Sequence, residues 1–180
     1  MSNQNTKIVT SPVVVSYPHL QTPYASVEGA KEKYSVTVLI PKTNTALIEK
    51  INKAIDNAIT DAIVKKFNGK APNKASIKSP LKDGDERDAK EFKGNYYLNL
   101  SSVEAPQLVD INLNPIIEKN AIVGGDTCRV SINFAAYNVG GSKGVSAYLG
   151  NVQLVSKTDK PFGSRATAET DFAKKDEEFL

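Results

Sequence analysis

The sequence has little of the chemistry that metal sites and nucleophilic catalysis need. It contains one cysteine, Cys128, and one histidine, His19. One cysteine excludes an internal disulfide, and one cysteine with one histidine cannot supply the four ligands of a structural zinc site. No G-x-S-x-G nucleophile motif occurs, and Gly124-Gly125-Asp126 lacks the Lys-Ser/Thr ending of a phosphate-binding loop. We therefore expect a protein that is not an enzyme, with no catalytic residue, cofactor or metal.

Long apolar runs are absent as well. No stretch of about 18 apolar residues occurs, so we expect no membrane span and no membrane partner. The first residues, MSNQNTKIVTS, lack the basic-then-apolar pattern of a secretory signal, which predicts a cytoplasmic protein. Cys128 alternates with Val130, Ile132 and Phe134, a pattern typical of a buried strand, so its thiol is expected in the core.

What the sequence does have is a charge split. Residues 169–180, ETDFAKKDEEFL, carry a net charge of −3, whereas the whole chain carries +3, which leaves +6 on residues 1–168. A basic body joined to an acidic tail favours binding of a polyanion by the body. The alternative is a solvated, frayed terminus. We predict a binding domain over residues 1–165 and a flexible acidic tail over residues 166–180.

Hydrophobic periodicity predicts a mainly β fold with one long inserted helix. Alternating residues predict strands at 8–17, 33–40, 96–101 and 108–113, and a hairpin of 127–138 with 145–155 joined by a flexible connection. Pro18 and Pro23 are expected to end regular structure. The pattern of residues 43–67 predicts an amphipathic helix whose N-terminus is capped by Thr43 or Thr45. Residues 69–94 are predicted to form a long polar loop. An OB-type five-stranded barrel with extended loops fits this count, as does a β-sandwich.

Aromatic residues interleaved with lysine and arginine predict a site for unpaired nucleotides. Strand-borne aromatics can stack on bases while cations bind the phosphates. Alternation places about half of these rings in the core: Tyr34 and Phe134 lean inward, whereas Tyr97, Tyr137 and Tyr148 are expected to be exposed. The candidate nucleic-acid-binding residues are Lys33, Tyr34, Lys78, Lys82, Arg87, Lys93, Tyr96, Tyr97, Arg129, Tyr137, Lys143 and Tyr148.

The acidic stretch 83–88 suggests a second chemistry. An EF-hand loop starting at Asp83 needs a glutamate at its twelfth position, where Gly94 stands, and Asp-Gly is also a turn signal. A metal-dependent nuclease using Asp83, Asp85 and Asp88 requires these carboxylates to converge. A virion or scaffold protein that ignores nucleic acid is the other alternative.

Several segments, taken in order, resemble a family of phage-encoded single-stranded-DNA-binding proteins of OB fold, for long a phage family of unknown function. The resemblance covers about residues 13–172. The matching pieces are SYPHL at 16–20, KYSVTVLIPK at 33–42, LKDGDE at 81–86, KGNYYLN at 93–99, Ser101-Ser102, Pro106, Asn133-Phe134, Tyr137-Asn138, Lys143-Gly144 and LGNVQ at 149–153.

This resemblance implies a replication and recombination accessory that coats single-stranded DNA in the bacterial host's cytoplasm. In the similar T7-like phage proteins, an acidic tail ending in an aromatic residue contacts the replication machinery, so a polymerase or helicase is the implied partner. The matching tail residues are Asp176, Glu177, Glu178, Phe179 and Leu180. Leu180 after the aromatic residue, and the interrupting Lys174 and Lys175, depart from that pattern. A homodimer is left open.

Overall fold

The computed structural model describes residues 5–25 and 27–163, and within these ranges it has nine strands and one α-helix. The predicted tail, residues 166–180, lies outside the described residues. The five long strands are β2 (Val13–Tyr24), β3 (Lys33–Pro41), β6 (Asn95–Ser102), β8 (Thr127–Val139) and β9 (Ser142–Ser156), and the short ones are β1 (Lys7–Val9), β4 (Ile77–Lys78), β5 (Lys82–Asp83) and β7 (Leu108–Val109). The helix α1 spans Thr45–Lys66.

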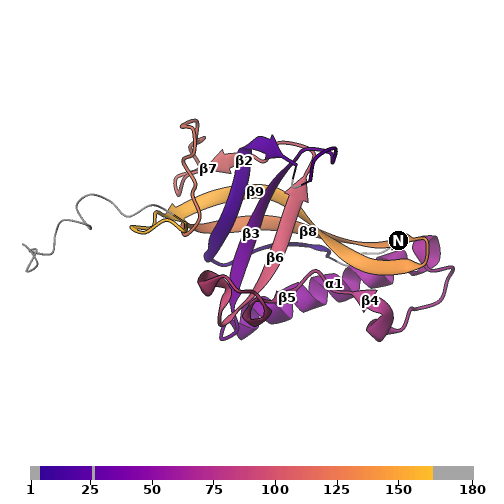
Figure 1. Cartoon of the computed structure of the whole chain (residues 1–180). Helices are drawn as coiled ribbons and strands as arrows, with labels where there is room; N and C mark the ends of the chain where they lie inside the picture. The colour runs from indigo at the N-terminus through magenta and orange to yellow at the C-terminus, as the bar shows by residue number, and fades with distance from the viewer. Residues whose placement is uncertain (1–4, 26, 164–180) are drawn as a thin grey trace, which may run out of the picture.

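The pairings of the five long strands close on themselves as a ring. β2 pairs with β8 and β3, β3 with β6, β6 with β9, and β9 again with β8. The β6–β9 pairing is parallel and the other four are antiparallel. In Figure 1, β2, β3 and β6 stand side by side across the long β8–β9 hairpin, and α1 lies along one side of that hairpin. The prediction of a mainly β fold with one helix is confirmed.

Strand alternation places the core inside this ring, as the sequence predicts. On β3, Val36, Val38 and Ile40 are buried, and on β6 Leu98 and Leu100 are buried with them. Phe134 and Cys128 on β8 belong to the same core, in agreement with both predictions. Burial raises the pKa of the Cys128 thiol to about 12, so this thiol is not a reactive group.

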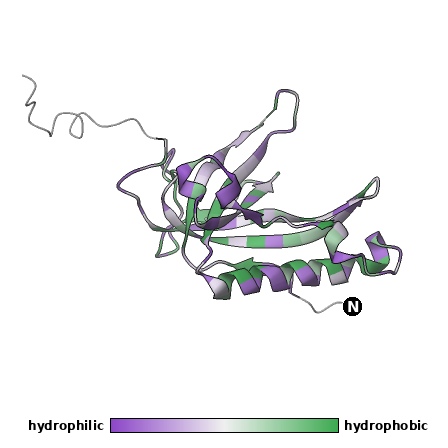
Figure 2. Ribbon diagram, turned by 60° about the horizontal axis from the view of Figure 1, so that its bottom comes forward, coloured by the Kyte–Doolittle hydropathy of each residue, from purple (hydrophilic) through white to green (hydrophobic). Residues whose placement is uncertain are grey.

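The helix α1 covers one flank of the core. Its buried residues recur every three to four positions, which turns one apolar stripe toward β8 (Figure 2). The predicted caps, Thr43 and Thr45, are wrong: the Asn44 side chain accepts the Leu47 N–H at 3.3 Å. At the other end Gly69, at φ +78°, donates its N–H to Ile63 O at 2.8 Å and ends the helix as expected.

Two connections differ from the sequence prediction. The flexible 139–144 connection is instead a two-residue turn, because Val139 pairs with Ser142 while Gly140 and Gly141 both adopt positive φ. β2 continues through Pro18 and Pro23 to Tyr24. Beyond Val14 it has β3 as its sheet neighbour and no pairing to β8, so a missing N–H is tolerated at that edge.

Two further boundaries are revised. The strand predicted at 108–113 ends at Val109, where a turn held by Asp110 begins. The polar loop 69–94 contains the short strands β4 and β5 and three 3-10 turns, η1 (Lys74–Ser76), η2 (Gly84–Glu86) and η3 (Lys90–Phe92). Across the described part of the chain, α1 lacks the apolar length that crossing a membrane requires, and no other helix has it.

The docking of α1 predicts a large cost for cavity formation at its centre. Ile51 is 0% exposed, so Ile51→Ala should lower the free energy of unfolding by about 2–5 kcal/mol in urea denaturation. Val64 on the same helix is 80% exposed, and Val64→Ala should change it by less than about 0.5 kcal/mol. Equal losses for the two variants would contradict the packing of this helix.

Candidate nucleic-acid interface

The outer faces of β3 and β6 carry small polar residues where their inner faces carry the core. Thr37 lies opposite Asn99 and Ser35 lies opposite Ser101 in the antiparallel register. The Thr37 hydroxyl is nearly buried and donates to Asn99 Oδ1 at 2.8 Å. These short side chains leave the middle of the sheet face open, with no large residue of either strand standing on it.

A hollow of about 410 Å³ opens over these residues on the β2 side. Three aromatic rings border it, those of Tyr17, His19 and Tyr24. The His19 and Tyr24 rings stack face to face, with their centres 4.3 Å apart and an 8° interplanar angle, so each ring covers one face of the other. We call this the tyrosine hollow; its lining residues are Tyr17, His19, Tyr24, Ser35, Val36, Thr37, Asn99 and Leu100.

Two further hollows continue this surface and carry lysines. The lysine hollow, about 300 Å³, is lined by Lys78, Ser79, Pro80, Lys82, Asn99, Ser101, Tyr137, Val145, Ser146 and Ala147. The outer hollow, about 390 Å³, is lined by Tyr24, Ala30, Lys31, Lys33, Ser35 and Ser101. Shared residues join the three hollows into one surface, which we call the groove face. Among the described residues, no aspartate or glutamate lines any of the three.

One end of the same sheet face is sealed, which corrects the prediction for Tyr97. Tyr97 does point to the outer side, but it is only 7% exposed because Phe92 packs edge-on against it at 5.1 Å, with Leu39 beside them. The Phe92 ring in turn stacks with Tyr17 at 6.2 Å. Tyr17 is 51% exposed, so it is the open end of a row of rings whose other end is buried.

An ion cluster holds in place the segment that packs over Tyr97, residues 83–94, which we call the cover. The Lys42 ammonium lies 2.7 Å from Asp83 Oδ1 and 2.6 Å from Asp85 Oδ2, and Asp85 Oδ1 accepts the Gly94 N–H at 2.7 Å. The hydrogen bond from Lys42 lowers the pKa of Asp83, and those from Gly94 and Lys42 lower the pKa of Asp85. Gly84 is required here, since a Cβ would come within 2.5 Å of Asn95 O.

The same cluster bears on the metal-site alternative. Asp83 and Asp85 neutralise a lysine, and Asp88 is exposed without joining them. Among the described residues, no group of three or more histidine, cysteine or acidic side chains is placed to hold a metal ion. The acidic stretch therefore serves as an anchor for the segment that covers Tyr97.

The structure brings four of the predicted residues to the groove face and a fifth, Tyr148, to its border. Lys33 lines the outer hollow, and Lys78, Lys82 and Tyr137 line the lysine hollow. Tyr148, 46% exposed, pairs in register with Ser101 and extends the face onto β9. Tyr137 is half-buried rather than open, because its ring lies directly over the backbone of Gly144.

The other predicted residues lie elsewhere. Arg87 and Lys93 belong to the cover: the Arg87 guanidinium lies 4.4 Å from the Phe92 ring centre, and Lys93 donates to Asp85 O. Lys143 lies 5.9 Å from the Phe67 ring at the end of α1, and Arg129 donates to Thr10 O on the β1 side. Tyr34, as predicted, and Tyr96 are half-buried against the core.

Sequence reasoning missed the aromatic border on β2. We did not predict Tyr17, His19 and Tyr24 as binding residues, because Pro18 and Pro23 were expected to end the strand. A bulge between Ser16 and His19, with Tyr17 at φ +48°, turns these rings toward the groove face. The sequence did contain a signal for these rings, namely the aromatic residues next to prolines in residues 17–24. Lys31 was missed because it precedes the predicted strand.

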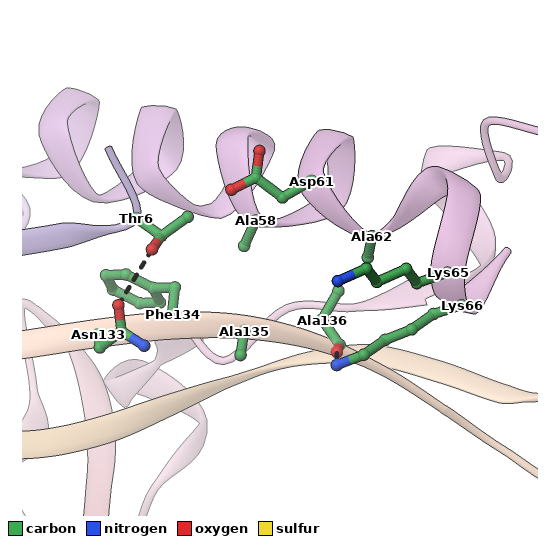
Figure 3. Close-up of a pocket in the computed structure, with 10 residues that line it drawn as sticks. All are labelled: Thr6, Ala58, Asp61, Ala62, Lys65, Lys66, Asn133, Phe134, Ala135 and Ala136. Carbon is green, nitrogen blue, oxygen red and sulfur yellow. Dashed lines mark hydrogen bonds between the residues drawn. The ribbon is translucent and has the colours of Figure 1, made fainter. Parts of the chain in front are cut away.

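Another hollow, between α1 and β8, is of a different kind (Figure 3). At about 220 Å³ it is smaller than the roughly 300–1,000 Å³ typical of ligand sites. Alanines of the helix and strand line it together with Phe134, which is 1% exposed and offers no free ring face. Lys66 at its edge donates to Ala136 O at 2.6 Å. It is a gap in helix packing rather than a nucleotide site.

Comparisons with known proteins place the chain in a family. The family model described as Enterobacter phage Enc34, ssDNA-binding protein, matches residues 6–180. Protein p50 of Acyrthosiphon pisum secondary endosymbiont phage 1 is 31% identical in a 172-residue alignment that covers 92% of this chain and 92% of that one. The chain therefore belongs to this family of phage single-stranded-DNA-binding proteins, and the resemblance inferred from its sequence is confirmed. Because the family binds DNA without catalysis, the protein is not an enzyme.

Solved structures show the same fold. The single-stranded DNA-binding protein from bacteriophage Enc34, in complex with ssDNA, is 26% identical with a TM-score of 0.73, covering 88% of this chain and 90% of that one. A C-terminal truncation of the Enc34 protein is 26% identical with the same TM-score, over 87% and 89%. Gp2.5, a single-stranded DNA-binding protein of bacteriophage T7, has a TM-score of 0.61 at 16% identity over 94% and 96%, a likeness of fold alone.

Because of this ion cluster, we expect the free energy of unfolding to fall at acidic pH. Because the pKa values of Asp83 and Asp85 lie below the ordinary 3.8, the folded state binds fewer protons than the unfolded chain. Their contribution to stability is complete above 3.8 and is lost as the pH falls through the lowered values. Urea denaturation from about pH 6 to about pH 2.5 should show this loss in the wild type, and a smaller one in Asp83→Asn/Asp85→Asn. Asp88→Asn should keep the wild-type profile; the same flattening there would refute the assignment.

Proposed function

We propose that the groove face is the surface on which this protein binds single-stranded DNA. The observation that carries the proposal is its continuity: exposed aromatic rings border a hollow of small polar residues, with Lys31 and Lys33 at one end and Lys78 and Lys82 at the other. The protein's membership of a phage single-stranded-DNA-binding family supports the nature of the ligand.

Binding combines two terms. Bases stack on Tyr17, on the His19–Tyr24 pair and on Tyr148, each stack contributing about 1–3 kcal/mol whatever the base. The lysines bind phosphates and release condensed counterions, which makes the affinity fall with salt. Neither base stacking nor phosphate binding depends on the base sequence, as coating of unpaired DNA in replication or recombination requires.

The ring of five strands supports an OB-type barrel as the binding domain, which we assign to residues 1–165, and the acidic residues 166–180 serve as its tail. Phe162 packs against the cluster of Leu39, Phe92 and Tyr97, and its N–H donates to Gly124 O at 2.8 Å. The described part of the chain therefore ends beside the rings that support Tyr17. From Gly163, the remaining residues span up to about 55 Å, enough to reach the groove face.

We further propose that the tail competes with DNA for the groove face and, once displaced, binds a replication or recombination protein such as a polymerase or helicase. Asp176, Glu177 and Glu178 supply the negative charge, and Phe179 and Leu180 an apolar end for the partner. The cytoplasm of the bacterial host is the compartment where this DNA and these partners meet. A homodimer is compatible with this arrangement.

A gel-shift comparison of single- and double-stranded oligonucleotides, with and without Mg²⁺, tests the function. We expect a shift with single strands, intact DNA and no need for Mg²⁺. Magnesium-dependent loss of the labelled strand would support a nuclease instead, and assembly of the protein without any shift would support a scaffold. Size-exclusion chromatography of the same samples measures the oligomeric state.

The lysine placement predicts a change in salt dependence. Lys33→Ala/Lys82→Ala removes one cation from each end of the groove face, so the slope of log affinity against log salt should become shallower by about 1.4. Fluorescence anisotropy over a salt series measures it. Lys53→Ala/Lys65→Ala removes the same charge from exposed positions on α1 and should leave the slope near the wild-type value. Equal changes in both double variants would place the DNA elsewhere.

Tail competition predicts tighter DNA binding without the tail. Deletion of residues 169–180 should raise the affinity for single-stranded DNA, most at low salt, because a competing anion is removed. Replacing the five acids by Asn and Gln should give the same gain while keeping the tail's length. If neither variant binds more tightly than the wild type, the competition part of the proposal is refuted while DNA binding by the groove face stands.

A further inference from the structure

We propose that Asn99 is a base-reading residue at the centre of the groove face, and that it favours bases carrying a carbonyl oxygen over adenine. This inference rests on the proposed function, since it names the part of the DNA that the same surface reads. It adds a modest preference to binding that is otherwise indifferent to sequence.

The first observation is the fixed orientation of the Asn99 amide. Thr37 lies directly across from Asn99 on β3, is 7% exposed, and donates its hydroxyl proton to Asn99 Oδ1 at 2.8 Å. This bond turns the amide oxygen toward the floor of the sheet and the amide nitrogen away from it. Asn99 Nδ2 makes no hydrogen bond to any of the described residues, so both of its N–H groups are available to a ligand.

The second observation is position. Asn99 is exposed, and it lines both the tyrosine hollow and the lysine hollow, so it stands where the two meet. The stacking rings lie on one side of it, and Lys78 and Lys82 lie on the other. A base stacked on the rings with its phosphate toward the lysines passes over Asn99 with an edge facing it.

The chemistry follows from which groups are left free. An asparagine that reads adenine uses both ends of its amide, donating from nitrogen and accepting the adenine amino proton at oxygen. Here the amide oxygen is turned to Thr37 and away from the groove face, so the Asn99 amide presents its N–H donors to a base. Thymine, cytosine and guanine carry a carbonyl oxygen that accepts this N–H. When N1 or N7 of adenine accepts it instead, the neighbouring amino group finds no acceptor on Asn99.

The test must separate hydrogen bonding from the strong self-stacking of adenine strands. We would compare an oligo-dT with a strand of equal length carrying 2,4-difluorotoluene, which keeps the shape of thymine but has no carbonyl. Fluorescence anisotropy at one salt concentration gives both affinities. The wild type should bind oligo-dT about five- to tenfold more tightly, the value of roughly one hydrogen bond at a partly desolvated site.

Asn99→Ala should bring this ratio close to one by weakening the binding of oligo-dT, with the analogue strand changed less than twofold. Asn52→Ala, at an exposed position on α1, is the matched control and should keep the wild-type ratio. A ratio that survives in Asn99→Ala, or that is near one in the wild type, overturns the inference. Failure of the wild type to bind either strand would instead refute the proposed function.

Thr37→Val tests the orientation itself. The substitution keeps the shape of the side chain but removes the hydroxyl, so the Asn99 amide is free to turn its oxygen outward. The preference for oligo-dT over oligo-dA should then narrow at least twofold, because adenine regains an acceptor. A purely structural role for Thr37 would lower both affinities by the same factor and leave the preference unchanged, which would contradict the donor-only assignment.

Discussion

The packing of Phe92 onto Tyr97 is the contact on which the rest of this surface depends. β3 and β6 present one continuous outer face, and without a cover Leu39 and Tyr97 would lie open at its end. The ion cluster around Lys42 holds the covering segment down, so one end of the face is sealed and the other is left open. The cover also gives Tyr17 a ring to stack on, and the groove face acquires its border from the same contact.

Ion pairs between acidic side chains and lysines determine which parts of the protein surface keep a positive charge. Asp83 and Asp85 are neutralised by Lys42, and the buried Asp126 accepts from Lys157 at 2.5 Å and from the Thr158 N–H at 2.8 Å. A body of only moderate net charge therefore has a groove face whose lining contains cations and no acids among the described residues. The Asp126 contacts also tie the start of the C-terminal segment to the loop before β8.

The sequence predicts strand faces well, because a period of two needs only the residues of one strand. It placed Val36, Val38, Phe134 and Cys128 correctly in the core. It erred where a distant segment adds a second layer: Tyr97 does face outward, but alternation carries no information about Phe92. The sequence analysis also missed the rings on β2. A bulge changes the face on which every later residue of the strand lies, and the two prolines led us to end the predicted strand too early.

The open half of the face differs from the sealed half in side-chain size, and that difference is an argument about function. Leu39 and Tyr97 fill the sealed half, whereas Ser35, Thr37, Asn99 and Ser101 occupy the open half. Residues this short bury little apolar area, so the protein's own loops gain little by covering them. They do provide donors, room and a rigid floor between flat rings, conditions that suit a planar, polar-edged group such as a nucleobase. The same sheet thus uses large residues where it excludes water and small ones where we propose that DNA binds.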